Sequence, residues 1–215
     1  IAAGIDTLIF ITGRNKRAIE DHFDDSFELE SQLLSTSKES YLDEIKNVID
    51  NATFTYVRQR QMLGLGHAIL TGEPLIGNQP FAVILADDLC DCEGDSVISQ
   101  MIEIYEKYQC SIIAIQEVPS NQTKNYGIIS GNILDKSANI YKVTDMVEKP
   151  KDNSALSNLA IIGRYILTPD IFDILRNIKS DQNGEIQITD ALREQAKKGK
   201  VIAYKFKGNR FDCGN

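Results

Sequence analysis

The sequence is poor in cysteine and has no long hydrophobic run. Its four cysteines form one C-x-C pair and two distant single residues: Cys90, Cys92, Cys110 and Cys213. This spacing fits neither a C-x₂-C zinc site nor a secreted disulfide scaffold, so we expect reduced thiols. The apolar stretches are far shorter than the ~18 residues of a membrane span, and none resembles a signal peptide. We therefore expect a soluble, cytoplasmic protein without a membrane partner.

Positive charge is also scarce. The 215 residues include 23 Lys and Arg against 31 Asp and Glu, a formal net charge of −8. Because such a surface repels a phosphate backbone, nucleic acid is excluded as a general partner. One small phosphate-bearing ligand, held locally by a metal ion or a single lysine, remains possible. The 42% of hydrophobic and 25% of charged residues are typical of a globular protein.

The chain opens without methionine. Residues 1–5 (IAAGI) read as the last turn of a helix, with Gly4 after its end, followed by a strand. The chain stops at 211–215 (FDCGN), directly after another predicted strand. We interpret the sequence as a fragment that lacks segments at both ends.

Strand and helix patterns alternate in the first half of the chain. Four apolar runs predict strands, at 7–12, 53–57, 81–86 and 111–118, and the segments between them are largely helical by pattern. This alternation predicts right-handed crossovers and a mostly parallel sheet with helices on both faces, an α/β fold.

After residue 118 the predicted strands are short and close together, which indicates an antiparallel lobe beside the parallel sheet. We expect these strands at 127–130, 141–148 and 159–167, followed by two helices and a last strand. The prediction is a single domain, 1–215. It consists of a first part at 1–118, the lobe at 119–167, and closing helices and a strand at 168–215.

Two adjacent carboxylates, Asp87 and Asp88, follow the most apolar strand. Ligands of open α/β sheets bind outside the carboxyl ends of strands, and Mg²⁺ with substrate phosphates needs only one or two carboxylates. The alternative is an acidic loop in solvent, which would also contain Asp91, Glu93 and Asp95. Position alone supports the two readings equally.

A turn with two glycines lies between a predicted strand and a helix. Gly64 and Gly66 follow Arg58 and Gln59, and glycine lets a backbone approach a ligand near the free N–H groups of a helix start. The G-L-G fragment is no established nucleotide motif, so a plain tight turn is favoured on these residues alone. His67 has no second histidine nearby, which favours packing over metal binding.

Glu148 and Lys149 end another predicted strand. A carboxylate can accept hydrogen bonds from sugar hydroxyls, and the adjacent ammonium group can neutralise a phosphate. A surface ion pair before Pro150 is the alternative, and these residues alone favour it.

Taken together and in order, the short motifs of this sequence resemble those of the bacterial UTP–glucose-1-phosphate uridylyltransferases. They are Arg58-Gln59, GLGHA at 64–68, LADD at 85–88, YG at 126–127, VEKP at 147–150, SNLAIIGRY at 157–165, EIQITDA at 185–191 and DCGN at 212–215. The resemblance covers essentially the whole chain and includes HFDDSFELE at 22–30.

The resemblance implies a sugar-nucleotidyltransferase fold, a Rossmann-like mixed sheet with an inserted sugar-binding lobe. The nucleotide-binding part then corresponds to 1–118 and the sugar-binding lobe to 119–167. In this family the residues matching Gln59, Gly64 and Gly66 recognise the uracil of UTP.

The resemblance also implies the sugar and metal residues. Those matching Gly127 and Glu148 bind glucose hydroxyls, and the one matching Lys149 binds the phosphate of glucose 1-phosphate. Those matching Asp87 and Asp212 lie at the Mg²⁺ cofactor, so Asp87 and Lys149 are the expected catalytic residues. The full-length protein is expected to be a homo-oligomer, a dimer or tetramer.

The family's glycine-rich loop, G-x-G-T-R, falls before the point where this sequence begins, and its C-terminal helices fall after the last residue. A smaller departure is Leu63, where many relatives have lysine. The implied reaction is in-line attack of the sugar phosphate on the α-phosphorus of UTP, without a protein nucleophile. We expect the 215 residues alone to be nearly inactive, because the loop that surrounds the triphosphate is missing.

Three alternatives remain. One is a sister nucleotidyltransferase that uses dTTP or another sugar phosphate, since a pocket separates uracil from thymine by only ~1–3 kcal/mol. Another is a metal-dependent UDP-sugar glycosyltransferase, against which the placement of Lys149 argues. The last is a folded core that binds UDP-glucose without turnover.

Overall fold

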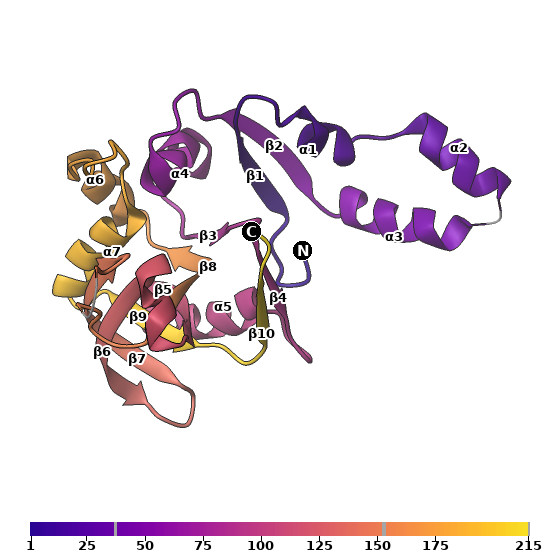
Figure 1. Cartoon of the computed structure of the whole chain (residues 1–215). Coiled ribbons are helices and arrows are strands. Elements are labelled where there is room, and N and C mark those ends of the chain that lie inside the picture. Colours follow the sequence, from indigo (N-terminus) through magenta and orange to yellow (C-terminus); the bar gives the residue numbers. More distant parts are fainter. Residues whose placement is uncertain (37, 152–153, 215) are drawn as a thin grey trace. The chain divides into compact units, whose positions relative to one another are not determined.

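The computed structural model describes residues 1–36, 38–151 and 154–214, in two compact units, Ile1–Met62 and Leu63–Asn215 (Figure 1). The elements of the first unit are β1 (Thr7–Thr12), α1 (Arg17–His22), α2 (Phe27–Ser35), α3 (Glu39–Asp50) and β2 (Thr53–Arg58). Among the described residues, no helix has the length and apolar character needed to cross a bilayer.

In the first unit, β1 and β2 form a parallel pair along their full length. Parallel neighbours need a long connection, and α1, α2 and α3 supply it. Four aromatic side chains pack together beside the strands, with ring centroids 4.7–6.1 Å apart: Phe10, Phe23, Phe54 and Tyr56. Because aromatic rings bury a large area each, this cluster forms the apolar centre of the unit.

The second unit is built on a six-stranded sheet in the order β3-β8-β5-β9-β7-β6. Its strands are β3 (Phe81–Ile84), β5 (Ser111–Glu117), β6 (Gly127–Asp135), β7 (Ile140–Glu148), β8 (Leu159–Leu167) and β9 (Val201–Lys205). A separate two-stranded sheet pairs β4 (Asp88–Asp91) with β10 (Asn209–Asp212). The helices are α4 (Gly64–Ile76), α5 (Val97–Tyr108), α6 (Asp170–Asn177) and α7 (Ile188–Lys197), with a 3₁₀ turn at Ser120–Asn125.

Helices cover both faces of the six-stranded sheet. Ile113 and Ile115 of β5 belong to one apolar core together with residues of α4, α6 and α7. Ile112 and Ala114 alternate with them and therefore point to the opposite face, where they are also fully buried. The helix α5 packs against β5 and β8. The predicted arrangement with helices on both faces is thus confirmed.

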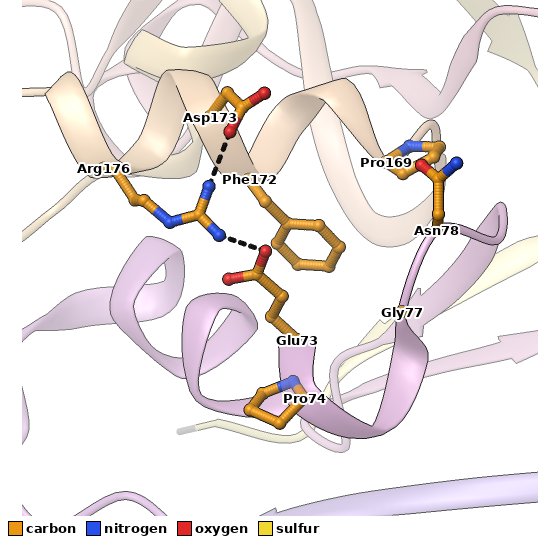
Figure 2. A pocket seen from close by; sticks show the side chains of 8 residues that line it. All are labelled: Glu73, Pro74, Gly77, Asn78, Pro169, Phe172, Asp173 and Arg176. Atoms are coloured by element: carbon orange, nitrogen blue, oxygen red, sulfur yellow. Dashed lines mark hydrogen bonds and ion pairs between the residues drawn. The ribbon is translucent and has the colours of Figure 1, made fainter.

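The helix α6 is tied to its neighbours by one ion-pair cluster and one ring stack. Figure 2 shows Arg176 of α6 between Glu73 of α4 and Asp173 of its own helix. Phe172 stacks on Phe81 of β3, with ring centroids 5.1 Å apart and an interplanar angle of 5°. These contacts anchor α4 and α6 at the β3 edge of the sheet.

The mixed α/β class is confirmed, but the expectation of a mostly parallel sheet needs correction. Among the described strands of the six-stranded sheet, only β5 and β9 pair in parallel. The strands β3 and β5 do point the same way, as strand–helix alternation predicts, because both run antiparallel to β8, which lies between them. Eight consecutive residues of β8 are buried, and such an apolar strand takes a central position.

Strands from all three predicted parts, 1–118, 119–167 and 168–215, join this one sheet. The division into these parts stays a prediction.

Candidate active site

Asp87 lies in an exposed turn between β3 and β4, and Asp212 ends β10. The pairing of β4 with β10 places Asp88 opposite Asp212, and the Cys213 N–H donates to the Asp87 carbonyl oxygen at 2.7 Å. The carboxylates of Asp87 and Asp212 flank Gly214. A Cβ at that glycine would lie 3.2 Å from Asp87 Oδ2 and 3.3 Å from Asp212 Oδ1. The structure therefore brings the two predicted metal residues together.

Asp88 has different surroundings from its neighbour. It is only 7% exposed, and its Oδ2 accepts a hydrogen bond from the Gly163 N–H at 2.7 Å. Its Oδ1 accepts a hydrogen bond from Nε of Arg210 and forms an ion pair with the same guanidinium group. Since Asp88 is buried as well as bonded within the protein, the exposed Asp87 is the carboxylate of the pair that can meet a ligand.

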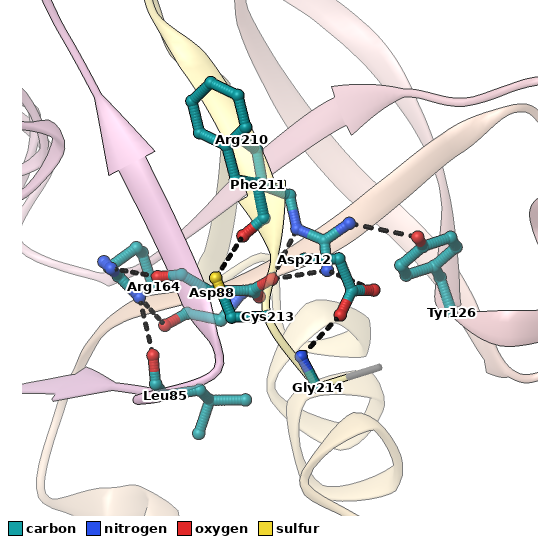
Figure 3. Close-up of polar contacts among 10 residues, drawn as sticks. Leu85, Asp88, Tyr126, Arg164, Arg210, Phe211, Asp212, Cys213 and Gly214 are labelled. Carbon is teal, nitrogen blue, oxygen red and sulfur yellow. Dashed lines mark hydrogen bonds and ion pairs between the residues drawn. The ribbon is translucent and has the colours of Figure 1, made fainter.

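Arg210 is a central residue that the sequence analysis missed (Figure 3). Besides its pair with Asp88, its Nη1 donates to the Tyr126 hydroxyl at 3.0 Å and its Nη2 to Asp212 Oδ2 at 3.2 Å. The guanidinium carbon lies 5.0 Å from the centroid of the Tyr126 ring. The sequence could have pointed to Arg210. Residues two apart on a strand share a face, and Arg210 precedes the predicted metal residue Asp212 by two.

A second arginine closes the turn that carries the acidic pair. Arg164 of β8 is 9% exposed and donates from Nη1 to the carbonyl oxygens of Leu85, at 3.0 Å, and Gly163, at 2.9 Å. Its Nη2 donates to the carbonyl oxygen of Asp88. A Cβ at Gly163 would lie 2.7 Å from Asp88 Oδ2 and 2.6 Å from Leu85 Cβ. The SNLAIIGRY motif therefore positions this turn.

The predicted sugar residues lie at the start of β6 and the end of β7. Gly127 pairs with Glu148, whose Oε2 accepts a hydrogen bond from the Thr189 hydroxyl at 2.6 Å. A Cβ at Gly127 would lie 3.1 Å from both Glu148 Oε2 and Thr189 Oγ1. Thr189 is 3% exposed and belongs to the EIQITDA motif, but the sequence analysis gave it no role.

Lys149 follows Glu148 in a left-handed conformation, with a φ of 42°. Its backbone N–H donates to the Tyr126 carbonyl oxygen at 3.0 Å. Its Nζ lies 3.9 Å from Glu148 Oε1, and its side chain is 62% exposed. The ammonium group is therefore only loosely paired and remains accessible to an anion.

Tyr165 connects the acidic turn with the sugar residues. Burial raises the pKa of its hydroxyl, and the nearby carboxylates of Glu148, Asp88 and Asp87 raise that pKa further. The hydroxyl therefore stays neutral. Together with the Arg210 contacts, the closeness of these carboxylates to Tyr165 places the predicted metal and sugar residues in one region of the second unit.

Gly64 and Gly66 lie in the first turn of α4, which packs against residues 185–186. The Gly66 N–H donates to the Ile186 carbonyl oxygen at 2.9 Å, and the Ile186 N–H donates to the Leu63 carbonyl oxygen at 2.8 Å. A Cβ added at Gly64 would lie 2.9 Å from the Ile186 carbonyl oxygen, and one added at Gly66 would lie 2.7 Å from the same oxygen. Gly64 also has a φ of +88°, which disfavours any other residue. Packing alone thus requires both glycines, and their contact with a nucleotide stays a prediction.

Replacing Gly66 with alanine should lower the free energy of unfolding by about 1–3 kcal/mol, because the new methyl group overpacks a backbone contact. Urea unfolding of the purified chain measures this change. Gly13→Ala is the control, since a Cβ at Gly13 would have nothing within 4 Å. Equal stability of the two variants would contradict the packing role of Gly66.

Gln59 directly follows β2 in the first unit, where its N–H donates to the Thr12 carbonyl oxygen at 2.8 Å. The other predicted site residues all belong to the second unit. The predicted nucleotide residues are therefore divided between the units.

Fold and site together define the class. A family model described as nucleotidyl transferase matches residues 1–215, and the chain belongs to this family. Enzymes of this kind generally use a divalent metal ion.

Within the family, the chain is similar to enzymes named UTP–glucose-1-phosphate uridylyltransferase. It is 58% identical to that of Pseudomonas aeruginosa, over 100% of this chain and 77% of the relative. It is 46% identical to that of Staphylococcus epidermidis, over 99% of this chain and 73% of the relative. The family resemblance inferred from the motifs is confirmed.

The chain is also similar to solved structures of UDP-glucose pyrophosphorylases. A UDP-glucose pyrophosphorylase complexed with UDP-glucose is 56% identical, with a TM-score of 0.91, over 100% of this chain and 78% of that chain. A UTP-bound UGPase from Acinetobacter baumannii is 36% identical, with a TM-score of 0.87, over 100% of this chain and 74% of that chain.

Proposed function

We propose that the protein to which this chain belongs catalyses transfer of the uridylyl group of UTP to glucose 1-phosphate, which yields UDP-glucose and pyrophosphate. The observation that carries the proposal is the similarity, over the whole chain, to enzymes named for this reaction. The structure supports it, because Asp212, which lies beside Asp87, is linked through Arg210 and Tyr126 to Lys149.

The divalent metal in this proposal is Mg²⁺, held by Asp87 and Asp212. The described residues include no group of three or more His, Cys, Asp or Glu side chains that could hold a metal ion alone. Two carboxylates beside Gly214 nevertheless suit Mg²⁺, which is usually bound through one or two carboxylates together with substrate phosphates. When bound there, the ion would neutralise charge on the reacting phosphates.

Glu148 and Gly127 would bind the glucose, and Lys149 its phosphate. The Thr189 hydroxyl bonds to Oε2 of Glu148 and so orients the carboxylate, leaving Oε1 to accept a hydrogen bond from a sugar hydroxyl. Gly127 keeps the space beside Oε2 free of a side chain. The exposed ammonium group of Lys149 can turn from Glu148 toward a phosphate, because the two groups are 3.9 Å apart.

Gln59, Gly64 and Gly66 would recognise the uracil in this proposal. A glutamine amide offers both donors and an acceptor, which match the mixed hydrogen-bonding edge of the base. The two glycines would contribute backbone groups at the start of α4.

No protein nucleophile is needed for this reaction. An oxygen of the sugar phosphate attacks the α-phosphorus in line, and the bond to pyrophosphate breaks. Lys149 would hold the attacking phosphate, and Asp87 would position the metal ion. Three of the cysteines are unsuited to covalent catalysis, because burial raises the pKa of the Cys90 and Cys92 thiols and that of Cys110 to about 11.

The full-length protein with UTP, glucose 1-phosphate and Mg²⁺ should release pyrophosphate and form UDP-glucose. With dTTP, kcat/KM should be about 10–200-fold lower, since the two bases differ by one methyl group. Equal kcat/KM for dTTP would identify the sister nucleotidyltransferase. Sugar transfer from UDP-glucose without pyrophosphate formation would identify a glycosyltransferase, and UDP-glucose binding without turnover a non-catalytic core.

We also propose that the full-length protein is a cytoplasmic homo-oligomer, a dimer or tetramer. All four cysteines are free thiols, which supports a reducing compartment. Several large apolar side chains of α2 and α3 are in solvent, which supports a subunit contact: Phe27, Leu34 and Tyr41 are 80%, 54% and 57% exposed.

A further inference from the structure

The first unit contains a cleft whose lining residues have no role in the proposed reaction as described above. It lies at the carboxyl ends of the parallel strands β1 and β2 and has a volume of about 650 Å³. Its lining includes Thr12, Arg14, Arg17, Tyr56 and Arg58. The volume is within the range of small-molecule sites, and the carboxyl ends of parallel strands are where α/β folds bind ligands.

Three guanidinium groups line this cleft, those of Arg14, Arg17 and Arg58, in a chain whose net charge is −8. One carboxylate, that of Glu20, lines it as well, so the local charge is positive. Within the described part of the chain, the three arginine side chains make no ion pair and no hydrogen bond.

The arginines of the second unit, in contrast, all have partners within the protein. Each of them, Arg164, Arg176, Arg193 and Arg210, is bonded to a carboxylate or to carbonyl oxygens. The cleft between α4 and α6 shows the contrast, because Glu73 and Asp173 neutralise Arg176 there (Figure 2). The exposed arginines of the first unit differ from these, and three of them, without internal partners among the described residues, surround one cleft.

Two further observations indicate a built site. Asn15, between Arg14 and Arg17, has a φ of 66°, so the loop that carries both arginines turns through a left-handed residue. The Tyr56 hydroxyl is buried and, among the described residues, has no hydrogen-bond partner. A buried hydroxyl normally has a partner, and a bound ligand with its water would provide one.

We propose that this cleft binds an anion carrying two or more phosphate groups, through Arg14, Arg17 and Arg58. Guanidinium groups bind phosphate oxygens in bidentate fashion, and three of them match the charge of a pyrophosphate group. Such an anion has two possible sources, the pyrophosphate moiety of the substrate or product, and a separate phosphorylated effector. Apart from Gln59, the residues of the proposed reaction lie in the other unit. With the substrate or product as the source, this inference rests on the proposed function, and with an effector it goes beyond that function.

Calorimetric titration of pyrophosphate into the full-length protein in metal-free buffer, where turnover is blocked, tests the proposal. Arg17→Gln and Arg58→Gln should each weaken binding by about tenfold or more, because a charge-assisted contact is lost. Arg60→Gln removes the same charge from an exposed position outside the cleft and should leave the affinity unchanged. Equal effects of all three variants, or none, would overturn the proposal.

Arginine labelling with phenylglyoxal, followed by mass spectrometry, gives a second readout that needs no variant. Pyrophosphate should protect Arg14, Arg17 and Arg58 but not Arg60, and protection of none of the three would overturn the site. Repeating the titration with saturating UDP-glucose distinguishes the sources. If UDP-glucose competes with pyrophosphate, the cleft binds the phosphates of the substrate or product. If pyrophosphate binding is undiminished, the cleft binds a separate effector.

Discussion

Asp87→Asn should lower kcat/KM of the full-length enzyme about a thousandfold, a loss of roughly 4 kcal/mol of transition-state stabilisation, because a charged metal ligand is removed. The fold should remain intact. Within the described part of the chain, the Asp87 side chain makes no hydrogen bond or ion pair, and the residue is exposed. Pyrophosphate release at increasing Mg²⁺ concentrations, together with thermal unfolding, measures both properties.

Asp91→Asn is the matched control, since Asp91 is also exposed but lies at the other end of β4. It should retain normal turnover. The sequence predicts a milder loss of activity for Asp88→Asn than for Asp87→Asn, and the structure adds that Asp88→Asn should destabilise the fold. Near-normal turnover of Asp87→Asn would remove this residue from the metal site.

Arg210→Met should lower the free energy of unfolding by about 3–5 kcal/mol, because the buried Asp88 would keep its charge without a cationic partner. The side chains of Arg210 and Asp88 are 10% and 9% exposed, so water cannot replace the lost contact easily. The variant also removes the bonds that Arg210 makes to Tyr126 and Asp212. Urea unfolding of the unchanged protein and of the Arg210→Met variant measures the difference in the free energy of unfolding.

The same substitution at Arg193 is the control, because it removes an arginine from an ion pair that is exposed rather than buried. Arg193 pairs with Asp145, but their side chains are 42% and 37% exposed. Arg193→Met should therefore cost only about 0–1 kcal/mol, as exposed ion pairs do. If both variants lost the same small amount, the Arg210 cluster would not stabilise the fold.

The strands could largely be predicted from local pattern. The run TLIFIT at 7–12 forms β1, and the expected strand at 159–167 is β8. Apolar runs bounded by turn residues indicate a strand because each such strand must bury its side chains. Neighbours in the sheet could not be predicted in this way, since the pattern of β8 shows that it is buried but not which strands it separates.

The candidate site was predictable only in part, for a similar reason. Position after a strand pointed to both Asp87 and Asp88, and only their surroundings distinguish them. Asp88 is bonded by Gly163 and Arg210, while Asp87 stays in solvent. Thr189 was missed because its partner Glu148 is far away in the sequence, and no local pattern links the two.

The sequence by itself determined the elements, the family and the chemical types of the site residues. These properties depend on short motifs and on the period of apolar side chains, which are local. The tertiary structure alone decided the partners of each charge, from the burial of Asp88 with Arg210 to the absence of internal partners for Arg14, Arg17 and Arg58 in the described chain. The reason is physical: the free energy of a charge depends on its burial and on groups brought close by folding, and neither is encoded at a fixed spacing.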